Sequence, residues 1–298
     1  MLKKLLAFSN PYHLSTKLDQ LVITSKETGE IISRPIEDLG FVILDNQQIT
    51  FTQHVLQLLA ENNVAVVICD PKHHPSSMLM HLDTHHIQAE RFRHQIASSE
   101  PLRKQLWQQT IKAKIRNQAK VLALAGESNI ALLNLANKVN SGDTMNIEGQ
   151  AARIYWKRLF GQNFYRQREG APPNPSLNYG YSIVRAAVAR AIVGSGLLPT
   201  LGIHHHNKYN SFALADDIME PYRPFVDLLI YQQVHSIPDY HNITKERKGE
   251  FLQLLTADCL FKGSTSPIMI AMEYSTASLA KCFEGNSKKI DYPEIPDQ

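Results

Sequence analysis

Two carboxylates and one imidazole stand where a purely structural role would be costly: Glu148, His205 and Glu220. At helical spacing Glu148 shares a stripe with Tyr155 and Leu159, so its charge would face a buried surface. A buried carboxylate needs a partner, hydrogen bonds or a bound cation. Two hard oxygen ligands and one nitrogen suit Mg²⁺ or Mn²⁺ and phosphoryl chemistry better than structural zinc.

The histidine belongs to a triplet, His204, His205 and His206. Without further evidence, one histidine of such a triplet is more often a hydrogen-bonded structural residue than a metal ligand. Other histidines crowd residues 73–94 without an HExxH pattern or a cysteine partner, so we interpret them as surface, capping or packing residues. They are His73, His74, His81, His85, His86 and His94.

The third candidate lies in an acidic cluster, with Asp216, Asp217 and Glu220 at positions i, i+1 and i+4. The alternative interpretation of this cluster is structural, because acidic residues in the first turn of a helix are favoured by the helix dipole. Arg223 and Asp227 stand four residues apart and are interpreted as a surface pair. Each feature is weak alone, and their order and spacing together carry the argument.

Basic residues concentrate in two stretches although the net charge is only +3. Residues 101–120 carry six Lys and Arg side chains and no acidic one, and residues 151–170 carry five against Glu169 alone. Such helical stretches can follow a phosphate backbone, and a solvated helix face is an equally good interpretation of composition alone.

The elements that must position these residues change in type along the chain. Strand patterns occupy residues 18–24, 31–32, 41–44 and 64–68, with a helix at 53–62 and a break at 70–77. Helical patterns follow at 85–97, 100–123, 127–139, 146–160, 175–195, 211–236 and 245–260. We therefore predict an α+β protein, with a small β-rich N-terminal domain (1–78) and a larger all-α catalytic domain (79–298).

The composition is that of an ordinary globular protein of 298 residues with 43% hydrophobic residues. No apolar run is long enough to span a bilayer, and the apolar run after Met1 is too short for a signal peptide. Cys69, Cys259 and Cys282 are isolated, which argues against a disulfide framework and a cysteine zinc site. We expect a cytoplasmic protein without membrane contact, ending in an acidic, proline-bearing tail over residues 291–298.

Four ordered motifs carry a resemblance to a known family. Residues 147–156 read IEGQAARIYW, residues 174–181 read NPSLNYGY, residues 201–205 read LGIHH, and residues 217–224 read DIMEPYRP. In this order and spacing the chain resembles the CRISPR-associated spacer-acquisition integrases, the universal first CRISPR-associated protein family. Residues 61–70 (ENNVAVVICD), 89–91 and 116–118 are similar to the branch found beside type II systems.

The resemblance implies that Glu148, His205 and Glu220 are the catalytic residues and hold Mg²⁺ or Mn²⁺. Asp216, Asp217, His204 and His206 are left without an assigned role, and some relatives carry Asp at the position of Glu220. The implied reaction is transesterification, in which the 3′-hydroxyl of a short DNA fragment attacks a phosphodiester of the CRISPR repeat. Positioning and charge neutralisation accelerate such a reaction without a covalent enzyme intermediate.

The resemblance also implies the partners. Double-stranded DNA is expected both as the incoming fragment and as the CRISPR repeat, and a homodimer is expected to join a small second CRISPR-associated subunit in a heterohexamer. The candidate phosphate contacts are Arg103, Lys104, Lys112, Arg116, Arg153, Lys157, Arg158, Arg166 and Arg168.

Two other functions use the same residues. A general metal-dependent nuclease would cleave branched or single-stranded DNA with water as the nucleophile, and strand-transfer products would distinguish an integrase from it. A DNA-binding scaffold would bind DNA without any metal-dependent chemistry. The complete set of Glu148, His205 and Glu220 argues against this hypothesis.

Overall fold

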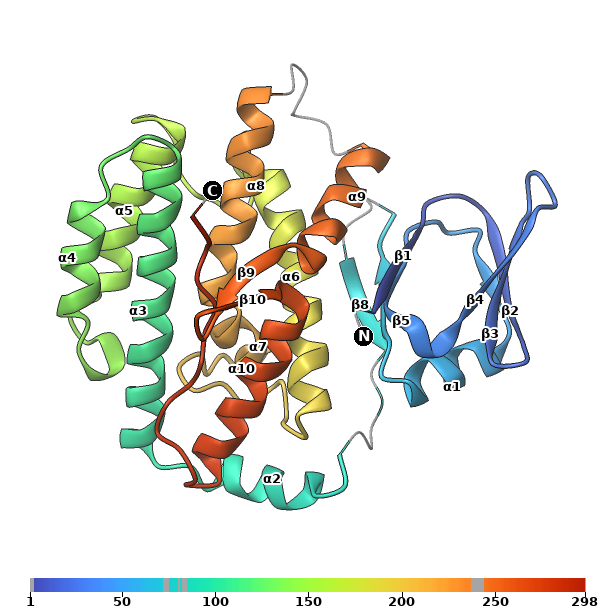
Figure 1. Ribbon diagram of the computed structural model, residues 1–298, viewed down its shortest axis with the longest axis horizontal. Coiled ribbons are helices and arrows are strands. Elements are labelled where there is room, and N and C mark those ends of the chain that lie inside the picture. The colour runs from blue at the N-terminus through green and yellow to red at the C-terminus, as the bar shows by residue number, and fades with distance from the viewer. Residues whose placement is uncertain (1–2, 72–74, 80, 82–84, 237–243, 298) are drawn as a thin grey trace.

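A computed structural model describes residues 3–71, 75–79, 81, 85–236 and 244–297, with strands concentrated in the first part of the chain and helices in the rest (Figure 1). This arrangement confirms the predicted α+β class. The strands are β1 (Lys4–Phe8), β2 (Tyr12–Lys17), β3 (Gln20–Ser25), β4 (Ile31–Pro35), β5 (Leu39–Leu44), β6 (Thr50–Phe51), β7 (Ala65–Cys69), β8 (Pro75–Leu79), β9 (Asp258–Phe261) and β10 (Ser264–Pro267).

The α-helices are α1 (Gln53–Glu61), α2 (Gln88–Ile96), α3 (Glu100–Leu124), α4 (Ile130–Lys138), α5 (Ile147–Phe160), α6 (Asn174–Gly194), α7 (Ala213–Ile218), α8 (Arg223–Ser236), α9 (Lys245–Gln253) and α10 (Ile268–Phe283). The short 3₁₀ turns are η1 (Ile36–Asp38), η2 (Ser141–Asp143), η3 (Glu220–Tyr222) and η4 (Leu254–Thr256). None of the helices in the described ranges is long and apolar enough to cross a membrane.

The N-terminal strands form two four-stranded sheets. One has the order β1-β5-β7-β8, in which β8 alone runs antiparallel to its neighbour, and the other has the order β4-β3-β2-β6. Leu18 and Asp19 join β2 to β3 with φ angles of 49° and 57°, as a two-residue hairpin turn requires. The strand predicted to start at residue 18 therefore begins at Gln20, because its first two residues form the turn.

Both faces of the first sheet are covered, which explains the continuous apolar runs in β5 and β7. Alternate side chains point to opposite faces of a sheet. Val42 and Val66 pack into the N-terminal core with residues of α1, whereas Phe41, Ile43 and Val67 belong to the core of the helical domain. The break predicted at residues 70–77 is wrong at its end, because β8 begins at Pro75 and continues this sheet. The predicted domain boundary after residue 78 stays a prediction.

The C-terminal part is mostly helical, with α6 buried along most of its length. The helix predicted at 211–236 is divided into α7, η3 and α8, since Pro221 and Pro224 lack the N–H groups that an unbroken helix needs. The helix predicted at 245–260 ends at Gln253 and gives way to a hairpin of β9 and β10 that turns at Lys262 and Gly263. This hairpin and α10 were not predicted, so the domain is helical with one small sheet.

The last described residues are packed against the helical domain, which answers a question that the sequence left open, namely whether they form an ordered segment or a plain tail. Ile290 and Ile295 are buried, and Glu294 exchanges backbone hydrogen bonds with Leu260 of β9. Asn117 of α3 donates to Pro293 O at 3.1 Å and accepts from Ile295 N–H at 3.3 Å. In Figure 1 the red segment that leads to the C-terminus passes beside α3 and α10.

Candidate active site

Glu148 is positioned by a double cap at the start of α5. Asn146 adopts φ 50°, and its side chain accepts a hydrogen bond from Gly149 N–H at 3.1 Å. The carboxylate of Asp143 accepts from Ile147 N–H at 2.9 Å and from Glu148 N–H at 3.0 Å. These bonds satisfy N–H groups that a helix start leaves unpaired. Glu148 therefore lies in the first turn, where the helix dipole favours a negative charge.

Glu220 is positioned by the 3₁₀ turn η3, between α7 and α8. Its neighbour Pro221 presents its carbonyl to Asn117 Nδ2 of α3 at 2.8 Å, which ties the turn to the long helix. The Glu220 side chain is 5% exposed, and Oε1 lies 3.1 Å from Arg223 Nε. Burial would raise the pKa of Glu220, but the charges of Arg223 and Lys114 outweigh it and hold the pKa below its ordinary value.

Lys114 joins the two carboxylates. Its Nζ lies 2.5 Å from Glu148 Oε1 and 2.5 Å from Glu220 Oε2, so one ammonium bridges α5 and η3 from α3. The Lys114 side chain is 11% exposed. Burial opposes its charge, but Glu220 and Glu148 outweigh burial and raise its pKa. The contact to Glu220 Oε2 is an ion pair without hydrogen-bond geometry, which leaves that buried oxygen able to accept a further ligand.

His205 is positioned by Asp217, which is fully buried. His205 Nδ1 lies 2.5 Å from Asp217 Oδ1, and Asp217 Oδ2 also accepts from His204 N–H at 2.9 Å. The bond from Asp217 raises the pKa of His205, despite the opposing effect of burial. A Cβ at Gly202 would overlap His205 O and lie 2.8 Å from Asp217 Oδ2, so only glycine lets this loop close over Asp217.

This loop rests on Trp107 of α3. The indole stacks on His204 with centroids 4.1 Å apart and an interplanar angle of 1°, and it meets His205 edge-on at 5.7 Å. His205 and Glu220 are close enough that each shifts the pKa of the other. The structure therefore brings all three predicted site residues into one region, walled by α3.

The donor set fits a divalent cation. With Nδ1–H of His205 bonded to Asp217, Nε2 keeps its lone pair for a metal, in the arrangement by which carboxylates orient metal-binding histidines. Glu148 and Glu220 add carboxylate oxygens, which Mg²⁺ and Mn²⁺ prefer. Within the described residues no three His, Cys, Asp or Glu side chains already converge on one point. At this site the Lys114 ammonium lies between the two carboxylates.

The remaining acidic residues have structural partners. Asp216 accepts from Arg185 Nη2 at 2.6 Å and from Asn210 Nδ2 at 2.7 Å, so it braces the loop before α7. The predicted surface pair of Arg223 and Asp227 is wrong. Arg223 pairs with Glu220, and Asp227 is buried and accepts hydrogen bonds from two tyrosine hydroxyls, because the face that they share points into the core.

A cavity of about 660 Å³ opens beside His205. It is lined by the 200–213 loop and by α2 and α3, and its basic side chains include Arg103 and Lys208. Arg103 also donates to Ser98 O at 2.9 Å, which fixes the guanidinium at the cavity wall. The cavity therefore offers positive charge next to His205.

The other predicted DNA contacts have different environments. Arg116, Arg153, Lys157 and Arg168 are exposed, Lys112 is half-buried, and Lys104 pairs with Glu100 at 2.7 Å. Arg158 donates to Ser128 O, and Arg166 is held by two asparagines. Within the part of the chain that the structure describes, no ion pair holds the exposed members in place, so they can reach a phosphate group.

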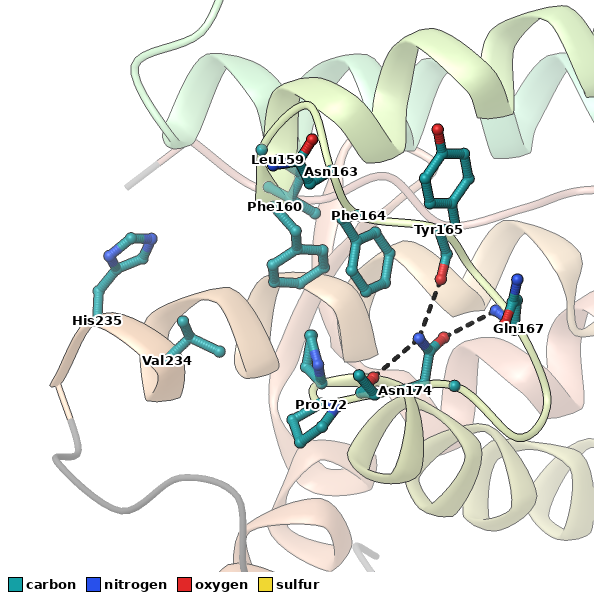
Figure 2. Close-up of a pocket in the computed structure, with 14 residues that line it drawn as sticks. Leu159, Phe160, Asn163, Phe164, Tyr165, Gln167, Pro172, Asn174, Val234 and His235 are labelled. Atoms are coloured by element: carbon teal, nitrogen blue, oxygen red, sulfur yellow. Dashed lines mark hydrogen bonds between the residues drawn. The ribbon is translucent and has the colours of Figure 1, made fainter.

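A second cavity, of about 640 Å³, lies under the loop that joins α5 to α6 (Figure 2). Asn174 organises this loop: its Oδ1 accepts from Gln167 N–H at 2.9 Å, and its Nδ2 donates to Tyr165 O and Ala171 O at 3.0 Å each (Figure 2). The same Oδ1 also accepts from Arg166 Nη1 at 3.0 Å. Asn178 accepts from Arg166 Nη2 at 2.7 Å. The asparagines of the NPSLNYGY motif thus build the loop and orient Arg166.

The histidines near the domain boundary do not gather as a metal site among the described residues. His85 stacks on His86 with centroids 4.7 Å apart and lies 2.8 Å from Arg91 Nη1, which agrees with a packing role. His73 and His74 lie outside the described residues. Cys69, Cys259 and Cys282 are buried free thiols.

Lys114 was not predicted as a site residue, although its position carried a signal. It lies on the helical stripe of Trp107, Ile111 and Gln118, all of which are buried. A lysine on a buried stripe needs an acidic partner, for the same reason that singled out Glu148.

Comparisons with known proteins show the family to which this chain belongs. Residues 5–247 match the family model described as CRISPR associated protein Cas1. The CRISPR-associated endonuclease Cas1 of Neisseria meningitidis serogroup C (strain 8013) is 35% identical over 293 residues, which cover 97% of this chain and 95% of the relative.

Solved structures share the fold at lower identity. A casposase bound to integration product has a TM-score of 0.78 and 20% identity, covering 98% of this chain and 93% of that chain. A chain of a Cas6-RT-Cas1–Cas2 complex has a TM-score of 0.74 and 17% identity, covering 99% of this chain and 36% of that chain. The family match and the Neisseria relative, which both extend over most of the sequence, show that this chain belongs to the Cas1 family of CRISPR-associated proteins.

Proposed function

We propose that this Cas1 protein is a metal-dependent DNA integrase and endonuclease of CRISPR adaptation, of the type II-like branch, that inserts short DNA fragments into the repeat. One observation carries the proposal: Glu148 and Glu220, from separate elements, converge on a single cation position, and Glu220 lies close enough to His205 for each to shift the pKa of the other. The Neisseria relative is named an endonuclease, and the casposase was solved with an integration product.

The chemistry is a phosphodiester exchange. The 3′-oxygen of the incoming fragment forms a new bond to phosphorus while the bond to the 3′-oxygen of the repeat breaks, and a proton passes from the attacking to the leaving oxygen. A bound Mg²⁺ or Mn²⁺ would stabilise the charge on the phosphoryl oxygen and favour ionisation of the attacking hydroxyl. Glu148, His205 and Glu220 would hold that ion, and Asp217 would keep His205 in the ligand tautomer.

The DNA would follow basic side chains around this site. Arg103 and Lys208 line the cavity beside His205, and exposed basic residues of α3 and α5 extend the positive surface. Such contacts position a duplex without reading its sequence. A steep loss of DNA affinity with rising salt is the expected signature.

We further propose a homodimer that joins a small second CRISPR-associated subunit. One chain of the Cas6-RT-Cas1–Cas2 complex shares the fold of this protein over 36% of its own length, which supports the proposed association with a small second subunit. Within the N-terminal domain, Ile31 and Ile32 are exposed on β4, the edge strand of the second sheet, so this edge can pair with another copy. Light scattering after size-exclusion chromatography, with and without the small subunit, measures both states.

The joining of a labelled DNA fragment to a repeat-bearing plasmid tests the reaction. Purified protein and its small partner are assayed in Mn²⁺ or Mg²⁺ against EDTA, using wild type, Glu148→Ala, His205→Ala and the control His206→Ala. The proposal requires metal-dependent joining that the first two variants lose and the control keeps. Cleavage without joining would favour a general nuclease, and binding without either product would leave a scaffold.

A further inference from the structure

Lys114 has no part in the reaction described above, although it is the residue on which both carboxylates converge. Its ammonium lies 2.5 Å from Glu148 Oε1 and 2.5 Å from Glu220 Oε2, and its side chain is 11% exposed. Three separate elements, α3, α5 and η3, therefore meet through one buried positive charge.

We propose that Lys114 is a positioning residue, an internal counter-cation that holds the two carboxylates together before the metal arrives and yields its position to the metal. The inference rests on the proposed metal site, since it assigns Lys114 a role toward the ion that Glu148 and Glu220 would bind.

Charge balance supports this role. Two carboxylates, Glu148 and Glu220, are matched by two cations, Lys114 and Arg223, so the formal charge of the cluster is zero without a metal. Without Lys114, Glu148 and Glu220 would repel each other at a site where Glu220 is buried and Glu148 is partly exposed. Glu148 would then lose the ion pair that joins it to η3.

Glu148 and Glu220 each direct one oxygen at a single position, which Lys114 Nζ occupies. A divalent cation held by these two residues would compete with the ammonium for that position, because two positive charges repel strongly at so short a separation. Lysine suits such a transfer, because its flexible stem lets the ammonium move while the helix stays in place. Arg223 can remain, since it contacts the other oxygen of Glu220 and lies 4.8 Å from the centroid of the Tyr181 ring.

The test compares metal binding by full-length wild type, Lys114→Met, Lys114→Arg and the matched control Lys120→Met, without DNA. Lys120 lies on the same helix and pairs with the exposed Asp297, so it is not part of this cluster. Free Mn²⁺ is measured by electron paramagnetic resonance, and thermal unfolding is followed in EDTA and across a Mn²⁺ series.

We expect Lys114→Met to unfold at a lower temperature than wild type in EDTA and to bind Mn²⁺ about tenfold more tightly, because a competing positive charge is gone. Its melting temperature should therefore rise more with Mn²⁺ than that of wild type. Lys120→Met should match wild type in both measurements, because it removes only an exposed pair. Lys114→Arg, which keeps the charge on a more rigid group, should bind Mn²⁺ no more tightly than wild type.

An unchanged or weaker Mn²⁺ affinity in Lys114→Met would overturn the inference, since a purely structural lysine would not compete with the ion. If that variant does not fold, Lys114→Gln replaces it under the same criterion. A wild type that binds no Mn²⁺, or binds it equally after Glu148→Gln, would instead refute the proposed metal site.

Discussion

His205 Nδ1 lies 2.5 Å from Oδ1 of Asp217, a carboxylate that is 0% exposed. The same carboxylate accepts the backbone N–H groups of His204 and His205, so it fixes both the loop and the ring. An imidazole held in this way offers Nε2 in one orientation. Asp217, three residues before Glu220, therefore links the loop of His205 to the helix that leads to Glu220, the third proposed ligand.

Asp217→Asn should weaken Mn²⁺ binding by about tenfold to a hundredfold, as for other residues that orient a metal-binding histidine. The amide removes the charge that holds the His205 ring and places an NH₂ group against backbone donors. Isothermal titration with Mn²⁺ measures the affinity. Asp216→Asn is the control, because Asp216 contacts Arg185 and Asn210 instead of the histidine. Equal affinities in the two variants would contradict the assigned role of Asp217.

Asp227 should make stability depend on pH. Burial raises the pKa of its carboxyl to about 7, although hydrogen bonds from Tyr181 and Tyr155 act in the opposite direction. A carboxyl that binds its proton more tightly in the folded than in the unfolded chain contributes stability that is present below about pH 4 and lost as the pH rises through 7. Asp227→Asn should remove this dependence, which amounts to about 4 kcal/mol at most.

Urea unfolding of wild type and Asp227→Asn at pH 5, 6, 7 and 8 measures the effect. The difference in unfolding free energy, variant minus wild type, should grow in favour of the variant from pH 5 to pH 8. Parallel curves would show that Asp227 keeps one protonation state across this range.

Gly180 should tolerate no side chain. A Cβ there would overlap Val226 Cγ1 and lie 2.9 Å from Phe251 Cε1, in the contact between α6, α8 and α9. Gly180→Ala should lower the free energy of unfolding by about 1–3 kcal/mol, as overpacking does. Gly249→Ala is the matched control, because no heavy atom lies within 4 Å of its added Cβ, and it should stabilise α9 by up to about 1 kcal/mol. Chemical denaturation measures both variants, and a stable Gly180→Ala would contradict the packing.

Lys248 should couple the N-terminal sheet to the helical domain. Its Nζ lies 2.5 Å from Asp45 Oδ2, with side-chain exposures of 12% and 3%. Lys248→Met should lower the free energy of unfolding by about 3 kcal/mol, since removing one partner of a buried pair leaves a buried charge less well compensated. Lys4→Met, which removes an exposed pair with Asp38, should change it by less than about 1 kcal/mol. Similar losses of unfolding free energy in the two variants would show that the buried pair contributes no more to stability than the exposed pair.

The sequence predicted the fold class and the long helices because their signals are local. Hydrophobic periodicity located α3 and α6 within a residue at either end, and Pro and Gly marked most of the breaks. The hairpin of β9 and β10 has strands of four residues, too short for a periodic signal, and the following α10 was missed with it. Strand β8 was missed because Pro75 reads as a break, although proline is tolerated at the start of an edge strand.

Site prediction had a similar limit. Motif order indicated Glu148, His205 and Glu220, and the structure brings them into one region, but spacing could not show which basic residue would meet them. Lys114 contacts Glu148 across 34 positions of sequence and Glu220 across a larger separation, so only the folded chain pairs them. Spacing also placed Arg223 and Asp227 on a shared helix face without revealing that the face is buried.

The packed C-terminal segment affects the order in which parts of the chain can fold during synthesis. Asn117, one turn beyond Lys114 on α3, accepts from the backbone of Ile295 and donates to the carbonyls of Pro221 and Pro293. Contacts of such long sequence separation form late, because a large loop must close first. The N-terminal strands leave the ribosome first, whereas the scaffold behind Glu220 is completed only after residues 290–297 have been added. The face of the first sheet that packs on the helical domain therefore stays uncovered for part of synthesis, and the candidate active site is assembled last.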